Sequence, residues 1–595
     1  MTSYNTSTSR KWVHTQPTSS NSSSSKNDPV DTIPKLFHTA IRRALEESSL
    51  YKARTAWRVG LQGHPDAKAI LDGIENGFSI LSSAPTSLPD NSAASSNKNL
   101  GSAKENPDFI TKKIGQELVA GRLLPVRLEW LAHVRTSPLG QVPKQPTGNR
   151  LIHHLSAPAG TSINDTIDKD DARAQYGSVD QATAALVERG AARSWMFKID
   201  FKDAFRHVRV RPQDVPQLGM HWDGTTYVDL CLPFGLRSSP HLFVKVAGAA
   251  LWIALNRLSS ESRHVRDALT MVHYLDDFLG IISDRDDAGL AMDVLVRTFT
   301  DLGLTVNDGK CVRPTQSVTF LGIELDAVNL IARLPEEKRL ATTQLVASYR
   351  LQSAATKRQL LSLAGSLFHA CKVVPPGRPF MATLLSAAYS VAGMGEAILL
   401  SDQRALLDDL HWWSLLLSRW NGRHMLVHQP TTPDLKVQTD ASSTIGYGIT
   451  YNDEWSYGRW DSALQPYAIH VKELLPIVAA AHLWGSRWTG RRVIFVCDNI
   501  AVVHALNNGL PRDGVLRRLV RLLMVASLSF SFTYEATHVA GVLNIDADDL
   551  SRGNIANFRS RSGHSFRSTP TLLGPELLRL LATAANGPSP TTDQR

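Results

Sequence analysis

Two adjacent aspartates interrupt an apolar stretch near the middle of this 595-residue chain. Residues 271–282, MVHYLDDFLGII, contain Asp276 and Asp277. Neighbouring side chains on a strand point to opposite faces, so two adjacent aspartates can converge on one site only where the strand turns. We therefore predict a hairpin with VHYL and FLGII as its strands and the two aspartates at the bend. A solvated Asp-Asp turn is the alternative interpretation.

A third aspartate ends an apolar stretch further upstream. Residues 195–205, WMFKIDFKDAF, predict a strand that closes with Asp200 and a turn that carries Asp203 and Phe205. A carboxylate at one strand end and two at a neighbouring hairpin could hold divalent metal ions, whose charge keeps the carboxylates ionised together. Two Mg²⁺ ions about 4 Å apart can activate a hydroxyl and stabilise a leaving phosphate oxygen.

Four further acids stand where predicted strands end or helices begin: Asp440, Glu473, Asp498 and Asp548. They belong to a segment that opens with the alternating LKVQTDAS and closes with DLSRG. Asp546 and Asp549 compete with Asp548 for the last place. Each of these acids, taken singly, could be a surface charge.

The composition limits the class of protein. With 43% hydrophobic and 20% charged residues the chain is typical of a globular protein, and its length predicts several domains. Lys plus Arg (64) exceed Asp plus Glu (55), a net charge of +9, which favours a polyanionic partner. We find neither an apolar run of about 18 residues nor the core of a signal peptide. We therefore expect an intracellular protein of the cytoplasm or nucleus, neither secreted nor membrane-bound.

The cysteine pattern also predicts an intracellular protein. They lie far apart and form no C-x-x-C pair, so they encode neither a zinc knuckle nor a disulfide framework. A reducing compartment fits this pattern. The four positions are Cys231, Cys311, Cys371 and Cys497.

The N-terminal third contains two segments of low complexity. Residues 1–30 and 82–106 are rich in Ser and Asn and predict a disordered tail and a disordered linker. Between them, residues 31–81 show apolar residues at helical spacing and predict a small helical segment.

The rest of the chain predicts a mixed α/β fold. Residues 107–331 alternate short apolar strands with helices, and residues 332–433 are helical and basic; residues 331–400 hold eight Lys/Arg against three Asp/Glu. A second α/β segment follows over 434–553. Residues 554–595 predict a basic, mostly disordered tail with one helix, PELLRLLATAA.

The order of motifs over about residues 120–553 resembles a reverse transcriptase. KIDFKDAF resembles the first palm motif, LPFGLRSSPHLF the second, YLDD the third, GLTVNDGKC the fourth and FLGIEL the primer-gripping strand pair. The resemblance implies a right-hand polymerase with fingers, a ferredoxin-like palm and a thumb. It assigns metal binding to Asp200, Asp276 and Asp277, the last less strictly a direct ligand in the family, with two Mg²⁺ (or Mn²⁺) ions in each active site.

The same resemblance implies substrate contacts around the first two motifs. Phe205 takes the place of an aromatic gate that leaves no room for a 2′-hydroxyl and so favours dNTPs; without the motif we would interpret it as a core aromatic. Phe234 and Gly235 would lie against the incoming base pair, with Gly235 permitting close backbone approach. Ser239 and Pro240 predict a helix cap and first helical residue, although an ordinary loop before a helix is the alternative.

Further contacts are implied for the phosphates. PKQPTGNRLIHHLS resembles the triphosphate-gripping strands, with Arg150 at the matching arginine and Lys144 nearby; a solvated charged hairpin is the alternative. Ser156 stands where many reverse transcriptases have a second arginine. Asp203 belongs to the implied substrate-binding turn, and Lys310 matches the lysine of the fourth motif, a candidate proton donor to pyrophosphate.

The second set of acids resembles the four carboxylates of ribonuclease H, which hold two metal ions that aim a water at an RNA phosphate. The family pattern N-x-x-A-D-x-L-S-R runs from Asn544 to Arg552 and selects Asp548. Pro476 is predicted to lie in the first helical turn, where its missing N–H costs little. His538 matches a mobile histidine thought to assist product release; a solvated loop histidine is the alternative.

The segments TKRQLLSLAGSLFHACKVVPPGRPF and DLHWWSLLLSRWNG resemble the connecting region of DIRS-group retrotransposons, which are thought to insert with a separate tyrosine recombinase. The resemblance implies an RNA- and DNA-directed DNA polymerase with ribonuclease H activity, serving retrotransposon replication. Its partners would be an RNA template, a DNA primer, an RNA–DNA hybrid and dNTPs. A catalytically silent nucleic-acid-binding relic and a nuclease with a scaffolding polymerase half are the rivals. Trp412, Trp413 and Trp420 could stack on nucleic acid or belong to the core.

Overall fold

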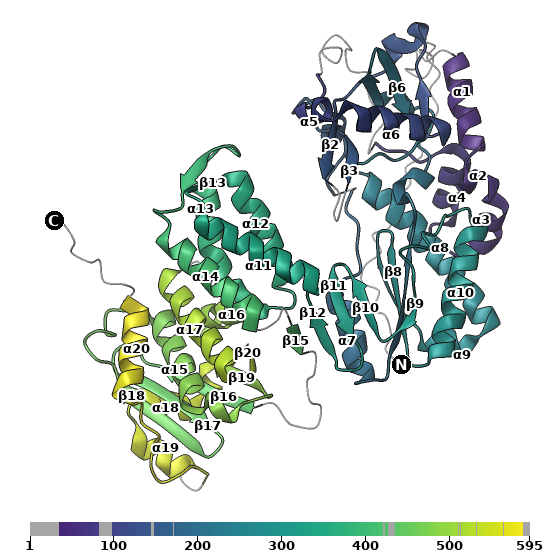
Figure 1. Cartoon of the computed structure of the whole chain (residues 1–595). Coiled ribbons are helices and arrows are strands. Elements are labelled where there is room, and N and C mark those ends of the chain that lie inside the picture. Colours follow the sequence, from purple (N-terminus) through teal and green to yellow (C-terminus); the bar gives the residue numbers. More distant parts are fainter. Residues whose placement is uncertain are drawn as a thin grey trace, which may run out of the picture. The chain divides into compact units, whose positions relative to one another are not determined.

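The computed structural model mixes helices and strands throughout, so the predicted α/β class is confirmed (Figure 1). The structure describes residues 35–81, 98–143, 148–170, 172–419, 423–425, 435–509, 511, 513–530, 532–562 and 565–586. The chain divides into two compact units, each built from separate stretches. Unit 1 comprises Met1–Gln175, Phe201–Ala254 and Arg297–Thr305, and unit 2 comprises Tyr176–Asp200, Leu255–Val296 and Val306–Arg595.

Unit 1 begins with short amphipathic helices. The first of them buries Phe37, Ile41 and Leu45, which lie four residues apart and therefore on one helical face. The helices of this N-terminal part are α1 (Lys35–Glu46), α2 (Ser49–Lys52), α3 (Arg54–Gly60), α4 (Ala67–Asn76), α5 (Gly101–Glu105) and α6 (Pro107–Val119).

Two small antiparallel sheets complete unit 1. One has the strand order β1–β6–β5 and the other is the hairpin β2–β3. A core that includes Ile110, Ile114, Leu123 and Met220 joins α6 to the three-stranded sheet. The strands are β1 (Leu123–Pro125), β2 (Leu139–Pro143), β3 (Asn149–His153), β5 (Gly219–Trp222) and β6 (Thr225–Asp229).

Helix α8 (Ser239–Glu261) is long and apolar enough, by length and composition alone, to cross a membrane. It is the one helix of this kind in the described part of the chain. Core helices of globular proteins pass the same test, and α8 buries Phe243, Val246 and Ala250 completely.

Unit 2 contains a four-stranded antiparallel sheet, here called the palm sheet, with the order β7–β8–β4–β9. A two-residue turn of Leu275 and Asp276 joins β7 to β8, and Leu275 adopts a positive φ of 50°. The predicted strand over WMFKID and the predicted hairpin are confirmed. The bend lies one residue earlier than predicted, because Leu275 belongs to the turn and Asp277 begins β8. The strands are β4 (Trp195–Asp200), β7 (Thr270–Tyr274), β8 (Asp277–Ile282) and β9 (Val312–Thr315).

A second antiparallel sheet follows, with the order β10–β11–β12–β15. The FLGIEL hairpin turns at Leu321 and Gly322, which both have positive φ, as a tight two-residue turn between twisted strands requires. The strands are β10 (Ser317–Phe320), β11 (Ile323–Asp326), β12 (Ile331–Arg333) and β15 (Arg423–Met425).

The predicted helical region contains the connection helices α11 (Glu336–Leu351), α12 (Lys357–Ala370), α13 (Ala382–Tyr389) and α14 (Arg404–Arg419). Helix α12 begins with a capping box between Thr356 and Gln359. A two-stranded sheet of β13 (Ala354–Thr356) and β14 (Ala397–Leu399) lies between these helices in the chain.

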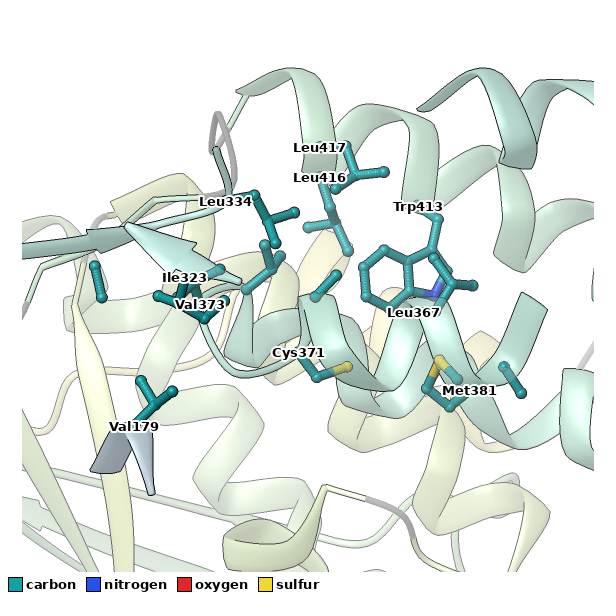
Figure 2. Packing of buried hydrophobic residues seen from close by; sticks show 14 of the residues in the cluster. Val179, Ile323, Leu334, Leu367, Cys371, Val373, Met381, Trp413, Leu416 and Leu417 are labelled. Carbon is teal, nitrogen blue, oxygen red and sulfur yellow. The ribbon is translucent and has the colours of Figure 1, made fainter. Parts of the chain in front are cut away.

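One hydrophobic core extends from the palm sheet through the connection helices. It includes Val179 of α7 (Val179–Arg189), Ile323 of β11 and Leu367 of α12, and it encloses Trp413 of α14 (Figure 2). Trp413 has no exposed surface, and Trp412 packs against the same core, so the core interpretation holds for both. Trp420 lies outside the described residues.

The C-terminal α/β segment has a five-stranded sheet in the order β18–β17–β16–β19–β20. The first three strands are antiparallel, whereas β19 runs parallel to both β16 and β20. The strands are β16 (Leu435–Ala441), β17 (Gly446–Tyr451), β18 (Glu454–Arg459), β19 (Arg492–Cys497) and β20 (Thr533–His538). The helices are α15 (Ile469–Trp484), α16 (Ile500–Asn508), α17 (Gly514–Phe530) and α18 (Ile545–Ser551).

Helix α15 begins earlier than expected. The prediction put Pro476 in the first helical turn, but the helix starts at Ile469, so Pro476 lies inside it. That prediction is wrong because the sequence contains no capping side chain that marks the start: Ala468 stands at the N-cap without a side-chain hydrogen bond.

A buried ion pair joins α17 to the connection helices. Asp409 of α14 is 1% exposed and accepts hydrogen bonds from Arg521 and Thr383. Burial raises the pKa of Asp409 to about 6, against the opposing effect of Arg521. Removing the arginine would therefore leave a buried acid without its cation.

The C-terminal residues are more ordered than the predicted mostly disordered tail. Helix α19 (Ile555–Ser562) packs Phe558 against Trp455 of β18, and α20 (Pro575–Asn586), which covers the expected helix, buries Leu581 in the core of the second sheet. The basic residues of this segment do not prevent it from folding, because apolar residues spaced along it pack against the domain.

Candidate active sites

The first site lies at one end of the palm sheet. Asp200, the last residue of β4, is the direct register partner of Asp277, the first residue of β8, and Asp276 lies in the turn beside them. Three carboxylates that are up to 77 positions apart in sequence therefore meet at one edge. Asp200 is 3% exposed, whereas Asp276 and Asp277 are partly exposed.

Polar side chains hold these carboxylates. The Lys310 ammonium lies 3.3 Å from Oδ1 of Asp200, and the Asn307 amide donates to the same oxygen at 3.0 Å. The backbone N–H of Asn307 also donates to the Asp200 carbonyl. Lys198 of β4 lies 3.0 Å from Asp277 of β8. The structure thus places Lys310 beside the acids, together with Asn307 and Lys198.

The electrostatics of this site suit a divalent cation. Burial raises the pKa of Asp276, and the negative charges of Asp277 and Asp200 raise it further. Burial also raises the pKa of Asp277, against the opposing charge of Lys198. Carboxylate oxygens are the ligands that Mg²⁺ and Mn²⁺ prefer, and a cation between these acids would relieve their repulsion. The donor set therefore fits the implied metal ions.

The predicted substrate residues of unit 1 form an aromatic group. The half-buried ring of Phe205 lies 5.2 Å from Phe234 and 5.6 Å from Phe243. The exposed Arg150 guanidinium lies 4.6 Å above the Phe234 ring. The structure thus brings Arg150, Phe205 and Phe234 together, and Phe205 is neither a free surface ring nor a fully buried one. Lys144 lies outside the described residues.

Gly235 makes a close approach, although to the protein's own backbone. Its φ is +114°, and a Cβ there would lie 2.1 Å from the carbonyl oxygen of His153, so no other residue fits. Ser239 is the first residue of α8, and its hydroxyl donates to the carbonyl of Pro233. The predicted N-cap role is therefore wrong: Ser239 belongs to the helix and its side chain fixes the preceding loop.

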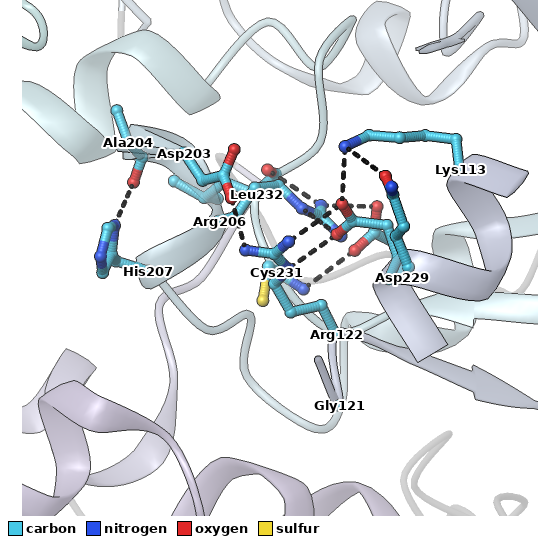
Figure 3. Close-up of polar contacts among 12 residues, drawn as sticks. Lys113, Gly121, Arg122, Asp203, Ala204, Arg206, His207, Asp229, Cys231 and Leu232 are labelled. Carbon is cyan, nitrogen blue, oxygen red and sulfur yellow. Dashed lines mark hydrogen bonds and ion pairs between the residues drawn. The ribbon is translucent and has the colours of Figure 1, made fainter. Parts of the chain in front are cut away.

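Asp203 has a partner within unit 1. It adopts a left-handed conformation, and its carboxylate lies 3.1 Å from Arg122. Arg122 also contacts Glu117, which pairs with the buried Arg206, so Asp203 lies at the edge of an ion-pair network (Figure 3). Asp229 completes the network through Arg206. The Asp203 side chain therefore helps to hold the turn that carries Phe205.

The second site collects the other four acids. Asp440 lies in β16, Glu473 in α15, Asp498 directly after β19, and Asp548 in α18. Asp440 and Glu473 are 4% and 3% exposed, and Asp498 and Asp548 are half-buried. Gly448 of β17, the register partner of Asp440, gives α18 room to pack, since a Cβ there would lie 2.3 Å from the carbonyl oxygen of Ala547.

Like charges in this site act on one another. Burial, followed by Asp440 and Asp498, raises the pKa of Glu473 to about 9. Burial also raises the pKa of Asp440 to about 6, and Asp498 and Asp548 contribute in the same direction. Four neighbouring acids, two of them buried, are the donor set expected for divalent cations.

The structure also separates Asp548 from its neighbours in sequence. The negative charge of Asp548 contributes to the raised pKa of Asp440. Arg561 of α19, by contrast, pairs with both Asp546 and Asp549. Asp548 itself contacts Arg552 at 2.8 Å. Of the three candidates, Asp548 is thus the one that the fold brings to the other acids.

Three further groups surround the second site. His538, at the end of β20, is exposed, and its Nε2 lies 3.1 Å from the carbonyl oxygen of Asp498. Ser551 donates to Asp440 at 2.6 Å, and Cys497 lies 3.8 Å from Glu473. Sequence reasoning included His538 but missed the roles of Ser551 and Cys497, although the serine is part of the L-S-R signal that selected Asp548.

Comparisons with known proteins fit the first site. Residues 142–325 match the family model of the Reverse transcriptase (RNA-dependent DNA polymerase). The enzymatic polyprotein of carnation etched ring virus is 23% identical over 345 residues, which cover 55% of this chain and 46% of that protein. The Gag-Pol polyprotein of Rous sarcoma virus (subgroup B) is 25% identical over 242 residues, 39% of this chain and 13% of that protein. The chain therefore contains a reverse transcriptase domain related to these viral polyproteins.

The chain spans less than half the length of these curated relatives. Among solved structures, a foamy viral protease-reverse transcriptase in complex with double-stranded DNA has a TM-score of 0.45 and 15% identity, over 85% of this chain and 83% of that one. The same viral enzyme in complex with an RNA/DNA hybrid has a TM-score of 0.43, also at 15% identity, over 81% and 62%.

Proposed function

We propose that this chain is an RNA- and DNA-directed DNA polymerase that also cleaves the RNA strand of RNA–DNA hybrids. The observation that carries the proposal is the cross-strand pair of Asp200 and Asp277 next to the turn residue Asp276, inside the segment that matches reverse transcriptases. The second group of four acids supports the nuclease activity.

In the polymerase reaction the primer 3′-oxygen bonds to the α-phosphorus of a dNTP, and the bond to the β-phosphate breaks, releasing pyrophosphate. Asp200, Asp276 and Asp277 would hold Mg²⁺ or Mn²⁺, two ions in all, which would supply charge neutralisation and a lowered pKa of the 3′-hydroxyl. Lys310, beside Asp200, would donate a proton to the leaving pyrophosphate.

The unit 1 residues would bind and select the nucleotide. Arg150 would contact the triphosphate, and its stacking on Phe234 limits its motion. Phe205 would exclude a ribose 2′-hydroxyl, because Phe234 and Phe243 restrict where its ring can move. Gly235 would keep the loop close to the base pair.

In the nuclease reaction a water oxygen bonds to an RNA phosphorus and the bond to the 3′-oxygen breaks. Asp440, Glu473, Asp498 and Asp548 would hold two divalent cations. Ser551 orients Asp440 by donating a hydrogen bond to it. His538, exposed at the rim, would assist product release.

The natural setting that we propose is replication of a retrotransposon of the DIRS group inside the cell. The two connecting segments that resemble this group support the assignment. A separate tyrosine recombinase of the same element would then carry out insertion. The substrates would be an RNA template, a DNA primer and the RNA–DNA hybrid that extension creates. The net charge of +9 supports binding to such polyanions.

One assay tests the proposal against its rivals. Purified full-length protein is incubated with a primed RNA template, dNTPs and Mg²⁺, and extended DNA and shortened RNA are measured together. Both products are expected. RNA cleavage without extension would point to a nuclease with a scaffolding polymerase half, and binding without either product would point to a catalytically silent nucleic-acid-binding protein.

A further inference from the structure

A buried thiol lies among the acids of the second site. The Sγ atom of Cys497, the last residue of β19, is 3.8 Å from Oε2 of Glu473. One ligand atom from each of Glu473, Cys497 and Asp498 lies within 4.8 Å of the other two. Within the described part of the chain, no other group of three or more His, Cys, Asp or Glu side chains is this compact.

The buried acid in this group has no protein cation to balance it. Glu473 is 3% exposed and forms no ion pair with the described residues. Its neighbour Lys472 instead donates to the carbonyls of Ser443 and Gln465. Arg552 contacts Asp548. The Glu473 carboxyl group is surrounded by the Cys497 thiol, the neighbouring acids and the backbone N–H of Ala441, so no cationic side chain occupies the place that a metal ion would take.

The thiol changes which cation this ligand set prefers. Mg²⁺ and Mn²⁺ favour oxygen ligands, whereas a cysteine sulfur combined with carboxylate oxygens suits Zn²⁺ and chemically similar soft cations. Cys497 is fully buried, but the adjacent Asp498 is half-buried and gives the group a side open to solvent.

We propose that Glu473, Cys497 and Asp498 form a binding site for a thiophilic divalent cation, Zn²⁺ or Cd²⁺. On binding, a metal–sulfur bond forms, the S–H bond breaks and the proton leaves to solvent, so no oxidant or reductant is needed. Two of the three ligands belong to the acids assigned to hybrid cleavage. If the proposed nuclease function holds, occupancy by such a cation excludes Mg²⁺ and stops cleavage.

Cadmium binding tests the site without any nucleic acid. Full-length protein is titrated with Cd²⁺ while the ultraviolet absorbance of the cadmium–thiolate bond is followed. We expect wild type to show this band, Cys497→Ala to lose the component with the highest affinity, and Cys371→Ala, which removes a buried thiol of the connection helices, to retain it. An absent band in wild type, or an unchanged titration in Cys497→Ala, overturns the proposal.

Two more variants keep this test decisive. Cys497→Ser preserves the size of the side chain, so it replaces Cys497→Ala if circular dichroism shows that the alanine variant does not fold. Asp498→Asn keeps the thiol but removes a ligand, and it should raise the Cd²⁺ concentration at half-saturation by about tenfold or more. An unchanged midpoint in Asp498→Asn would mean that the carboxylates take no part, and would also overturn the site.

Inhibition of cleavage provides the second readout. At a fixed Mg²⁺ concentration, Zn²⁺ should inhibit hybrid cleavage by wild type at a concentration about tenfold lower than for Cys497→Ala. Equal sensitivity of the two proteins contradicts the proposal. If wild type cleaves no hybrid at all, the proposed nuclease function fails, while the cadmium titration still decides whether the metal site exists.

Discussion

Asp200 and Asp277 face each other as register partners on β4 and β8, and each contacts a different lysine. Lys310 reaches Asp200 from the loop before β9, and Lys198 reaches Asp277 from β4 itself. The lysines supply positive charge at the end of the palm sheet, where burial and the neighbouring carboxylates raise the pKa values of Asp276 and Asp277. Divalent cations at this end would compete with these ammonium groups for the same oxygens.

Removing one palm carboxylate should abolish DNA synthesis. We expect Asp276→Asn or Asp200→Asn to reduce primer extension by about a thousandfold, because metal-bound charge stabilisation is worth several kcal/mol. Hybrid cleavage should be largely unchanged, since it depends on a different set of acids. Asp223→Asn, in an exposed turn whose positive φ asparagine tolerates, is the matched control. Normal extension by purified Asp276→Asn would contradict the polymerase assignment.

Substitutions of the acids in the second site should have the opposite effect on the two activities. Asp498→Asn and Asp548→Asn should remove RNA cleavage and spare primer extension. Asp546→Asn should retain cleavage, because that carboxylate pairs with Arg561 instead of joining the site. Gel analysis of a labelled hybrid measures all three variants. Loss of both activities in a folded Asp498→Asn protein would argue against independent sites.

Sugar selection should depend on Phe205. Phe205→Val should raise incorporation of CTP relative to dCTP by up to about a thousandfold, equivalent to about 4 kcal/mol, because the clash with the 2′-hydroxyl is relieved. Phe243→Val is the matched control: this ring is fully buried in the same aromatic group, so its loss should lower stability without changing sugar choice. The ratio of CTP to dCTP incorporation and the thermal midpoint, measured for both variants, distinguish a sugar gate from a core residue. An unchanged ratio in an active, stable Phe205→Val protein would refute the gate.

The buried Glu473 should make stability depend on pH. Its pKa is about 9 in the fold and 4.5 as the ordinary value, so the folded state binds the proton more tightly. Without divalent cations, this group's stabilising effect is complete below pH 4.5 and is lost as the pH rises towards 9. Glu473→Gln should therefore stabilise the protein more at pH 8 than at pH 5, which thermal unfolding measures. The exposed Glu576→Gln is the control and should show no such difference.

The Asp409–Arg521 pair should stabilise the contact between α17 and the connection helices. We expect Arg521→Ala to lower the free energy of unfolding by about 3 to 5 kcal/mol, because Asp409 stays buried without its partner. Arg492→Ala, which removes a more exposed pair with Glu535, should cost less than about 1 kcal/mol. Denaturant titration measures both. Similar small losses would mean that Asp409 is stable as a neutral acid.

Local patterns predicted the hairpin and its bend to within one residue, because strand periodicity and the carboxylate pair are both local signals. Asp200 and Asp277 face each other because of the register between two strands that are far apart in the chain. Hydrophobic periodicity does not encode this register. Cys497 is a comparable case. The resemblance to ribonuclease H predicts that Glu473 meets Asp498, but not that Glu473, 24 positions from Cys497, also meets the neighbouring sulfur.

Two other differences between the sequence predictions and the structure have a physical cause. The Arg-rich and Ser-rich composition after residue 554 resembles that of disordered chains, but Phe558 and Leu581 find apolar surface that only the folded domain offers. Asp203 looked like a substrate contact from its place in the motif. Its pairing with Arg122, 81 positions earlier, became visible only in three dimensions.

The packing of α19 and α20 sets where the second domain can be cut. A protein shortened after Arg552, the end of the last motif, would uncover Trp455 and remove Leu581 from the core. The newly exposed apolar surface would favour aggregation, and any loss of nuclease activity would then report insolubility and not chemistry. Truncation should therefore retain the chain through Asn586, the last residue of α20.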